Sequence, residues 1–371
     1  MLIGVPAEIK PEEYRVGLVP ETIRELTARG HRVEVETRAG VGAGISDQEY
    51  LEAGAGIVDA AERIFERAEL IVKVKEPLAS ERRRLRRGQT IFTYLHLAPD
   101  RAQLDDLLQS GVTAIAYETV TDPAGKLPLL APMSKVAGSM APQVAANFLQ
   151  YFHGGRGMLL GGVDGVSPAQ VAILGGGTVG TSAAHVAIGM GAQVTIGVRS
   201  SATAAELAKQ FEGRARVIVA DAKAVAELCR SADVLIGAVL VPGAAAPKLI
   251  SREMIGTMKR GAVLVDVSID QGGCSETSRP TTHGDPTYIV EGVVHYCVAN
   301  MPGSVPRTST FALNDATRPF LLALAEKGIA RALREDAGLC NGLNVHDGRL
   351  TCRPVADANG LPFVPARSLL Q

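Results

Sequence analysis

Hydrophobic positions along the chain alternate between short apolar runs and longer segments in which apolar residues recur every three or four positions. Residues 2–5 (LIGV) and 33–37 (VEVET) have the short aliphatic pattern of strands, and residues 20–30 between them have a helical spacing that ends at Gly30. A helix that connects two such strands predicts a β-α-β unit.

The same alternation continues through the N-terminal third of the chain. Residues 59–68 have helical spacing, and residues 70–74 (LIVKV) and 89–97 (QTIFTYLHL) have the pattern of strands. These elements predict one open α/β domain. Residues 134–152 carry apolar or small side chains at helical spacing, so they predict a long connecting helix that the glycines after it bring to an end.

A second and more regular series starts at Gln170. Its strand-like runs alternate with helical runs and are residues 170–175, 193–198, 216–220, 233–239 and 262–267. Parallel strands with crossover helices on both faces of the sheet are the simplest fold for this alternation.

Beyond Asn300 the sequence has helical runs and no further strand-like run. We expect these helices to pack back on the first domain and make it discontinuous. The predicted fold is therefore α/β, with two Rossmann-like domains and a cleft between them. Residues 1–130 and 305–371 are predicted to form one domain, and residues 131–304 the other.

Composition and charge exclude several classes of function. The 38 Lys and Arg residues balance 39 Asp and Glu residues, so a net charge of −1 offers no basic surface for nucleic acid. No apolar run reaches the length of a membrane span, and the N-terminus lacks the apolar core of a signal peptide. Five widely spaced cysteines without a C-x-x-C pair indicate reduced thiols in a cytoplasmic protein, and no histidine pair has metal-site spacing.

Three glycines stand in G-x-G-x-x-G register, directly after the apolar run VAIL and before a helical run. Gly175 permits a tight turn, Gly177 lets the backbone approach a pyrophosphate, and Gly180 allows close packing of helix and strand. Thr178 and Val179 complete the turn. The free N–H groups and the positive end of the following helix would face the diphosphate, so this turn predicts a dinucleotide site. Residues 131–304 are therefore predicted to be the dinucleotide-binding domain, and residues 1–130 and 305–371 the substrate domain.

The end of the second strand of this series bears on the choice of coenzyme. An acidic residue normally binds the adenosine ribose there, but this chain has Val198, Arg199 and Ser200. Valine cannot accept a hydrogen bond, whereas arginine and serine can hold a 2′-phosphate. The triplet therefore favours NADP(H), and NAD(H) remains the alternative if Arg199 is only an exposed loop cation.

Long motifs throughout the chain resemble the signature segments of the alanine dehydrogenase family. They are EIKPEEYRVGLVP at 8–20, IVKVKEP at 71–77, FTYLHLAPD at 92–100, DVSIDQGGCSETSRPTTHGDPTY at 266–288 and VVHYCVANMPGSVPRTST at 293–310. The resemblance runs essentially from end to end. It extends to a close relative, the nicotinamide-binding subunit of proton-translocating transhydrogenase.

The resemblance implies four residues that act on the substrate. Arg15 matches the arginine that binds the substrate carboxylate, and Lys75 matches a lysine that contacts the carboxylate and the reacting carbon. His96 matches the general acid and base, in keeping with an imidazole that titrates near neutrality. Asp270 matches the second catalytic residue. Asp266, four residues earlier, is expected only to cap or turn the chain.

The resemblance also implies further coenzyme contacts beyond the glycine turn. They are Ser134, Val239, Leu240, Arg279, Asn300 and Met301. The chain departs from the family pattern at Val198 and also at Lys135 and Ser139, where glutamate and arginine are more frequent. These departures concern the coenzyme region and not the four substrate residues.

The activity that the resemblance implies is the reversible NAD(P)-dependent conversion of L-alanine to pyruvate and ammonium. It also implies a homo-oligomer, commonly a hexamer, without a nucleic-acid or membrane partner. Two alternatives stay open. One is the same chemistry on another small amino or imino acid, and the other is a transhydrogenase-like nucleotide-binding module that works only with protein partners.

Overall fold

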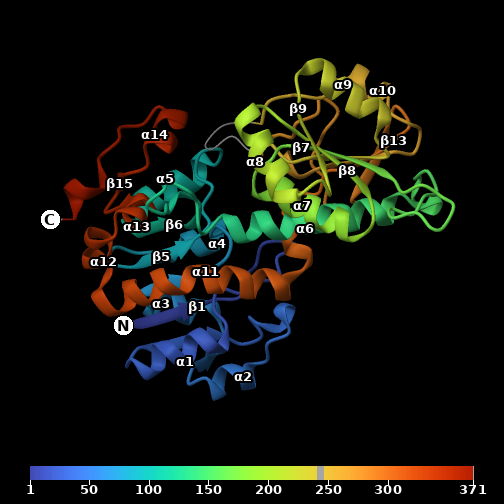
Figure 1. Cartoon of the computed structure of the whole chain (residues 1–371). Helices are drawn as coiled ribbons and strands as arrows, with labels where there is room; N and C mark the ends of the chain where they lie inside the picture. Colours follow the sequence, from blue (N-terminus) through green and yellow to red (C-terminus); the bar gives the residue numbers. More distant parts are fainter. Residues whose placement is uncertain (240–245, 371) are drawn as a thin grey trace. The chain divides into compact units, whose positions relative to one another are not determined.

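The computed structural model describes residues 1–239 and 246–370 and divides the chain into two compact units (Figure 1). One unit combines Met1–Met133 with the C-terminal segment that starts at Gly303, and the other runs from Ser134 to Pro302. Each unit has its own mostly parallel sheet, which confirms the predicted fold class. No helix in the described residues is both long and apolar enough to cross a membrane.

The sheet of the first unit has the strand order β15-β14-β6-β5-β4-β1-β2-β3. Its six N-terminal strands pair in parallel, and register pairs such as Ile3↔Val33 and Ile71↔Ile91 align their apolar residues. These strands are β1 (Leu2–Val5), β2 (Arg32–Glu36), β3 (Gly56–Val58), β4 (Leu70–Val72), β5 (Thr90–Thr93) and β6 (Thr113–Ala116).

The C-terminal segment adds two strands to this sheet, so the expectation of helices alone was wrong. β14 (Leu343–His346) pairs antiparallel with β6, and β15 (Arg349–Leu350) forms the edge beyond it. With four and two residues, β14 and β15 are too short to show a periodicity in the sequence. The partner of β14, strand β6, lies more than two hundred residues earlier in the chain.

Helices cover the sheet of the first unit, and local sequence signals start several of them. α1 (Pro20–Ala28) begins with proline at its first position, and a capping box of Ser46 and Glu49 starts α2 (Asp47–Glu52). The remaining helices are α3 (Ala61–Arg67), α4 (Ala79–Arg82), α5 (Arg101–Ser110), α11 (Pro306–Lys327), α12 (Ile329–Glu335), α13 (Ala337–Asn341) and α14 (Arg353–Asn359).

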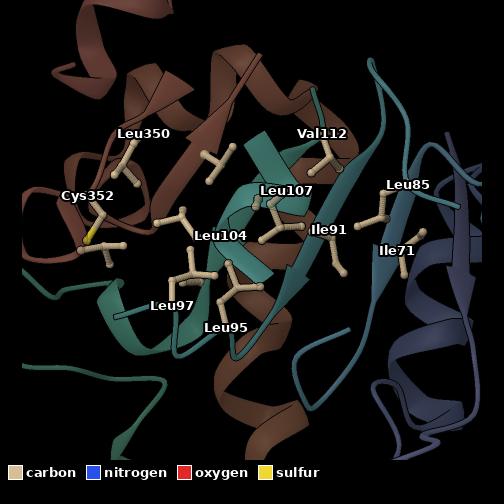
Figure 2. Packing of buried hydrophobic residues seen from close by; sticks show 14 of the residues in the cluster. Ile71, Leu85, Ile91, Leu95, Leu97, Leu104, Leu107, Val112, Leu350 and Cys352 are labelled. Atoms are coloured by element: carbon tan, nitrogen blue, oxygen red, sulfur yellow. The ribbon is translucent and has the colours of Figure 1, made fainter. Parts of the chain in front are cut away.

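One apolar cluster joins the C-terminal segment to the parallel sheet. Figure 2 shows Leu350 and Cys352 in the same group as Leu97 and Leu104, and Ile91 of β5 belongs to the cluster as well. All these side chains are buried. Their removal from water stabilises the discontinuous unit at roughly 25 cal/mol for each Å² of apolar surface.

The sheet of the second unit has the order β12-β13-β11-β10-β7-β8-β9. β8 and β9 lie on one side of β7, and the chain then crosses back to place β10 on the other side, which is a doubly wound arrangement with a switch point at β7. The strands are β7 (Gln170–Leu174), β8 (Gln193–Val198), β9 (Arg216–Val219), β10 (Val234–Gly237), β11 (Val263–Asp266), β12 (Thr287–Val290) and β13 (Val293–Tyr296).

The pairs β7–β8, β8–β9, β7–β10, β10–β11 and β11–β13 are parallel, and β12 pairs antiparallel with β13 at the edge. The connecting helix expected at residues 134–152 is present as a helix that starts three residues earlier and ends four residues earlier. The helices of this part are α6 (Ala131–Phe148), α7 (Thr178–Gly189), α8 (Ser201–Phe211), α9 (Ala222–Ser231) and α10 (Arg252–Gly256).

Candidate active site

The predicted glycine turn joins β7 to α7 at the switch point of the second sheet. Gly175 has a φ of 116°, and a Cβ atom there would lie 2.3 Å from the carbonyl oxygen of Ala238. A Cβ atom on Gly180 would lie 1.9 Å from the carbonyl oxygen of Gly175. The packing of the turn itself therefore requires glycine at both positions.

Gly177 differs from its two neighbours in the motif. Apart from its two chain neighbours, no described residue has an atom within 4 Å of the position that a Cβ atom on Gly177 would take. The φ of Gly177 is −80°. It is the N-cap residue of α7, and no side chain caps that helix. A bare backbone beside uncapped N–H groups fits the phosphates of a dinucleotide.

Val198 is the last residue of β8, and it packs against the same turn. Its Cγ1 atom lies 2.7 Å from the position that a Cβ on Gly176 would take. Ser200 caps α8 by accepting a hydrogen bond from the N–H of Thr203 over 3.1 Å, a role that its position before a helix could have indicated. Arg199 is exposed and forms no hydrogen bond or salt bridge within the described part of the chain.

The strand ends β10 and β11 bring two further predicted segments to the glycine turn. The Ser268 hydroxyl donates to the carbonyl oxygen of Val239 over 2.8 Å and accepts from the Val239 N–H over 3.0 Å. Because Ala238 is the residue that approaches Gly175, these bonds place Val239 beside the turn. Leu240 lies outside the described residues.

Asp266 and Asp270 have different surroundings. Asp266 is buried and accepts hydrogen bonds from the Cys274 N–H over 2.8 Å and the Ser278 hydroxyl over 2.6 Å, so it holds the loop that follows. Asp270 is exposed in the 3₁₀ helix Val267–Gln271 and accepts from the N–H of Asn300 over 3.3 Å. The structure therefore brings Asp270 and Asn300 together.

The other predicted coenzyme residues occupy varied positions. The guanidinium of Arg279 lies 4.0 Å from the ring centre of Tyr288, and Met301 is buried. Ser134 is half-buried in α6, one helical turn before Gly138, where a Cβ atom would lie 2.3 Å from the carbonyl oxygen of Val179. Ser134 is thus near the first turn of α7, whereas the Arg279 side chain is engaged by an aromatic ring.

In the first unit Arg15 is buried, with only 2% of its surface exposed. Its Nε and Nη2 atoms donate to the two carboxylate oxygens of Glu13 over 2.6 and 2.5 Å, and Nη1 lies 3.0 Å from the sulfur of Met133. Burial alone would lower the pKa of Arg15, but the Glu13 carboxylate raises it. The edge of the guanidinium formed by Nε and Nη2 is therefore used within the protein.

The α11 helix fixes the segment that follows Arg15. The Asn314 side chain donates to the carbonyl oxygen of Gly17 over 3.0 Å and accepts from the hydroxyl of Thr22 over 2.6 Å. The N–H of Val16 donates to the hydroxyl of Thr310 over 3.3 Å. The C-terminal segment thus positions a predicted substrate residue nearly three hundred residues away.

Lys75 follows β4, and a buried ionic cluster lies behind it. The Oε1 atom of Glu8 accepts from the N–H groups of Val74 and Lys75 over 2.6 and 3.3 Å. The ammonium of Lys73 lies 3.1 Å from Glu8 and 2.8 Å from Glu81. Burial alone would lower the pKa of Lys73, but the two carboxylates raise it.

His96 lies three residues beyond the end of β5, outside regular secondary structure, and not in the strand-like run that the sequence indicates. Its side chain is exposed, its φ is 49°, and its N–H donates to Glu118 over 2.6 Å. The imidazole is stacked on Tyr94 with ring centres 5.7 Å apart and an angle of 7° between the planes. A non-glycine residue in left-handed conformation is strained, which is typical of functional sites.

Three predicted substrate residues of the first unit come from neighbouring strand ends. The Thr93 hydroxyl donates to the carbonyl oxygen of Lys75 over 2.8 Å, and this contact links the ends of β4 and β5. A Cβ atom on Gly17 would lie 2.6 Å from the carbonyl oxygen of Val72, so the segment after Arg15 crosses the end of β4. The segments that carry two cations and an imidazole therefore lie at the carboxyl edge of one parallel sheet.

Sequence reasoning missed the acids that hold these residues. Glu13, Glu8 and Glu118 contact Arg15, the Lys75 backbone and the His96 backbone respectively. Glu13 had a weak signal, because it stands two residues before Arg15. Glu8 and Glu118 had none, since they meet their partners only through the sheet.

A doubly wound sheet with an uncapped, glycine-rich helix start defines the class of dinucleotide-binding α/β proteins. Sequence profiles of the alanine dehydrogenase/PNT family match residues 4–137 with its N-terminal domain and residues 141–353 with its C-terminal domain. The chain belongs to this family.

Individual proteins agree with the family profiles. An alanine dehydrogenase of Halomonas elongata is 56% identical over 370 residues, which cover all of both chains. A solved L-alanine dehydrogenase is 49% identical with a TM-score of 0.94 and covers 97% of this chain and 99% of its own. A transhydrogenase from Sinorhizobium meliloti is 27% identical with a TM-score of 0.83 and covers 95% of this chain and 100% of its own.

Proposed function

We propose that the chain catalyses the reversible oxidative deamination of L-alanine to pyruvate and ammonium. The observation that carries this proposal is the group of Arg15, Lys75 and His96 at the carboxyl edge of one sheet, in a chain whose second sheet carries the dinucleotide turn. Full-length similarity to alanine dehydrogenases supports it. When bound, the nicotinamide supplies the acceptor of the hydride that leaves the substrate Cα.

The two cations of the first unit are proposed to bind the substrate carboxylate. Arg15 is charged at every working pH, and Glu13 fixes the plane of its guanidinium. Lys75 adds a second positive charge from a strand end that Glu8 holds by the backbone. A zwitterionic amino acid bound in this way has its Cα in a fixed position, which lowers the entropic part of the barrier.

His96 is proposed to move the protons of the reaction. It takes a proton from the substrate ammonium, so that the nitrogen lone pair can help to expel the hydride from Cα. The protonated imidazole then releases this proton to solvent. Neutral again, it takes a proton from the water that adds to the resulting iminium carbon and returns it to the departing nitrogen, and the hydroxyl proton of the collapsing carbinolamine leaves with the ammonia as ammonium. Asp270 is proposed to stabilise the positive iminium through its carboxylate.

Coenzyme choice follows from the end of β8. We propose that NADP(H) is preferred, because Val198 cannot accept a ribose hydrogen bond and the exposed Arg199 has no partner among the residues described. The ratio of kcat/KM for NADPH and NADH measures this preference. Arg199→Ala should lower kcat/KM for NADPH and leave that for NADH unchanged, and a strong NADH preference of the natural chain would contradict the proposal.

The central experiment is an assay of NADH and NADPH oxidation with pyruvate and ammonium. Coenzyme oxidation that requires both substrates supports the proposal, and its absence favours a transhydrogenase-like module. A panel of small amino acids in the oxidative direction then tests for another substrate. A higher kcat/KM for any of them than for L-alanine would replace alanine as the substrate.

Assembly and location are proposed together. We propose a cytoplasmic homohexamer. Five buried cysteines without a disulfide support a reducing compartment, and large exposed apolar side chains in the second unit, such as Tyr151 and Phe152, support contact between copies. Light scattering coupled to size exclusion measures the mass, and a monomer would contradict the hexamer.

A further inference from the structure

One carboxylate from the segment after the neighbouring strand β6 binds the backbone at His96. The His96 N–H donates to Oε1 of Glu118 over 2.6 Å, and the N–H of Leu95 lies 3.2 Å from each carboxylate oxygen. Two successive N–H groups that converge on one anion form an anion-binding concavity of the backbone. His96 has a φ of 49° in this segment, which costs roughly 1–3 kcal/mol without compensating contacts.

We infer that Glu118 is the positioning residue for His96, which sets where the imidazole meets the substrate. The inference rests on the proposed role of His96 in proton transfer. Glu118 acts through the backbone of His96 and is not itself assigned a contact with the substrate.

The imidazole is held on its other side by Tyr94. The two rings are stacked with centres 5.7 Å apart, and the Tyr94 hydroxyl donates to the carbonyl oxygen of Leu129 over 2.6 Å. Tyr117 packs edge-on against Tyr94 with ring centres 5.1 Å apart. One face of the His96 ring is therefore covered by Tyr94, and its backbone N–H is bound by Glu118.

Contacts with the C-terminal segment hold the chain next to Glu118 in place. Glu118 lies in the 3₁₀ helix Tyr117–Thr119 after β6, and the Asn344 side chain of β14 donates to the Thr119 hydroxyl over 2.7 Å. The N–H of Thr121 donates to the carbonyl oxygen of Gly338 over 3.2 Å. A Cβ atom on Gly338 would lie 2.0 Å from the Thr121 carbonyl oxygen, so this contact is close.

The inference predicts a loss of turnover without a loss of coenzyme binding. Glu118→Leu removes both carboxylate oxygens, so the backbone at His96 relaxes and the imidazole shifts. A displacement of about 1 Å costs up to roughly 100-fold in rate. We expect kcat/KM for alanine to fall about 10- to 100-fold. Glu118→Gln keeps one carbonyl oxygen for the His96 N–H and should therefore retain more activity than Glu118→Leu.

A double-mutant cycle with His96→Ala separates positioning from general damage. If Glu118 acts through His96, Glu118→Leu has no further effect on kcat/KM in the His96→Ala background. Asp122→Asn is the matched control, because Asp122 accepts from the N–H groups of Ala124 and Lys126 over 2.9 and 2.8 Å in a turn of the same unit. It should keep kcat/KM near that of the natural chain.

The outcomes distinguish this inference from the proposed function. Normal turnover of His96→Ala would defeat the proposed role of His96 and the inference with it. Loss of turnover in His96→Ala together with normal kcat/KM in Glu118→Leu would overturn the inference alone, as would fully additive losses in the cycle. If Glu118→Leu fails to fold, as shown by a lower free energy of unfolding in urea melts, Glu118→Gln decides by the same cycle, and additivity there overturns the inference.

Discussion

The three glycines of the dinucleotide turn should respond differently to the same substitution. In Gly177→Ala the new methyl group meets no atom of another described residue within 4 Å, its two chain neighbours aside, and the φ of −80° suits alanine. A less flexible unfolded chain contributes about 0.4–1 kcal/mol in favour of folding. The loss of glycine at a helix N-cap costs a similar amount, about 0.5–1 kcal/mol. The free energy of unfolding should therefore change by less than about 1 kcal/mol.

Coenzyme binding should change strongly in the same variant. The methyl group occupies the space that the pyrophosphate needs, so we expect the dissociation constant to rise at least about tenfold, which corresponds to about 1.4 kcal/mol. In Gly180→Ala, by contrast, the methyl carbon would lie 1.9 Å from a backbone oxygen, and a stability loss of about 1–3 kcal/mol is expected from overpacking. Gly180→Ala is thus the matched control, in which the free energy of unfolding is the quantity that we expect to fall.

Two measurements on each variant test this contrast. Urea unfolding gives the stability, and a fluorescence titration with NADH and NADPH gives the dissociation constant. If Gly177→Ala binds both coenzymes as tightly as the natural chain, the phosphates do not lie at this turn. If Gly180→Ala is as stable as the natural chain, the close approach of the turn to α7 is wrong.

Three further perturbations test other parts of the structure. Lys73→Met leaves two buried carboxylates without their cation and should lower the free energy of unfolding by about 3 kcal/mol in urea melts; a loss below about 1 kcal/mol would contradict the buried cluster. Burial lowers the pKa of His295 below the value of about 6.5 in an unfolded chain, so the unfolded state takes up the proton first and stability falls as the pH drops below about 6.5. Urea melts at pH 7.5 and 5.5 should show a smaller difference for His295→Gln than for the natural chain, and an equal difference refutes this account. His96→Ala and Asp270→Asn should lose kcat while the KM for the coenzyme stays within about threefold, because neither removes a phosphate contact; near-normal turnover in either variant removes that residue from the proposed chemistry.

The resemblance predicts four substrate residues by position, and the fold adds the surroundings in which they lie. Arg15 shows the difference, because a planar guanidinium with five donors was expected to face a substrate carboxylate. In the structure Glu13 takes the Nε and Nη2 donors. The motif identifies the cation, whereas only the packing shows which of its donors are already used.

Local sequence determined the alternation of helices and strands, the glycine turn and the two-domain fold class, because periodicity and steric limits act between residues that are near in the chain. Tertiary structure alone decided that β14 lies beside β6 and that Glu8 binds the backbone N–H of Lys75. It also decided the left-handed conformation of His96, whose N–H binds Glu118. Each of these joins residues at least 22 positions apart, up to more than two hundred, so no local periodicity or spacing encodes it. The free energy that holds them comes from burial and hydrogen bonds formed only after the sheet has assembled.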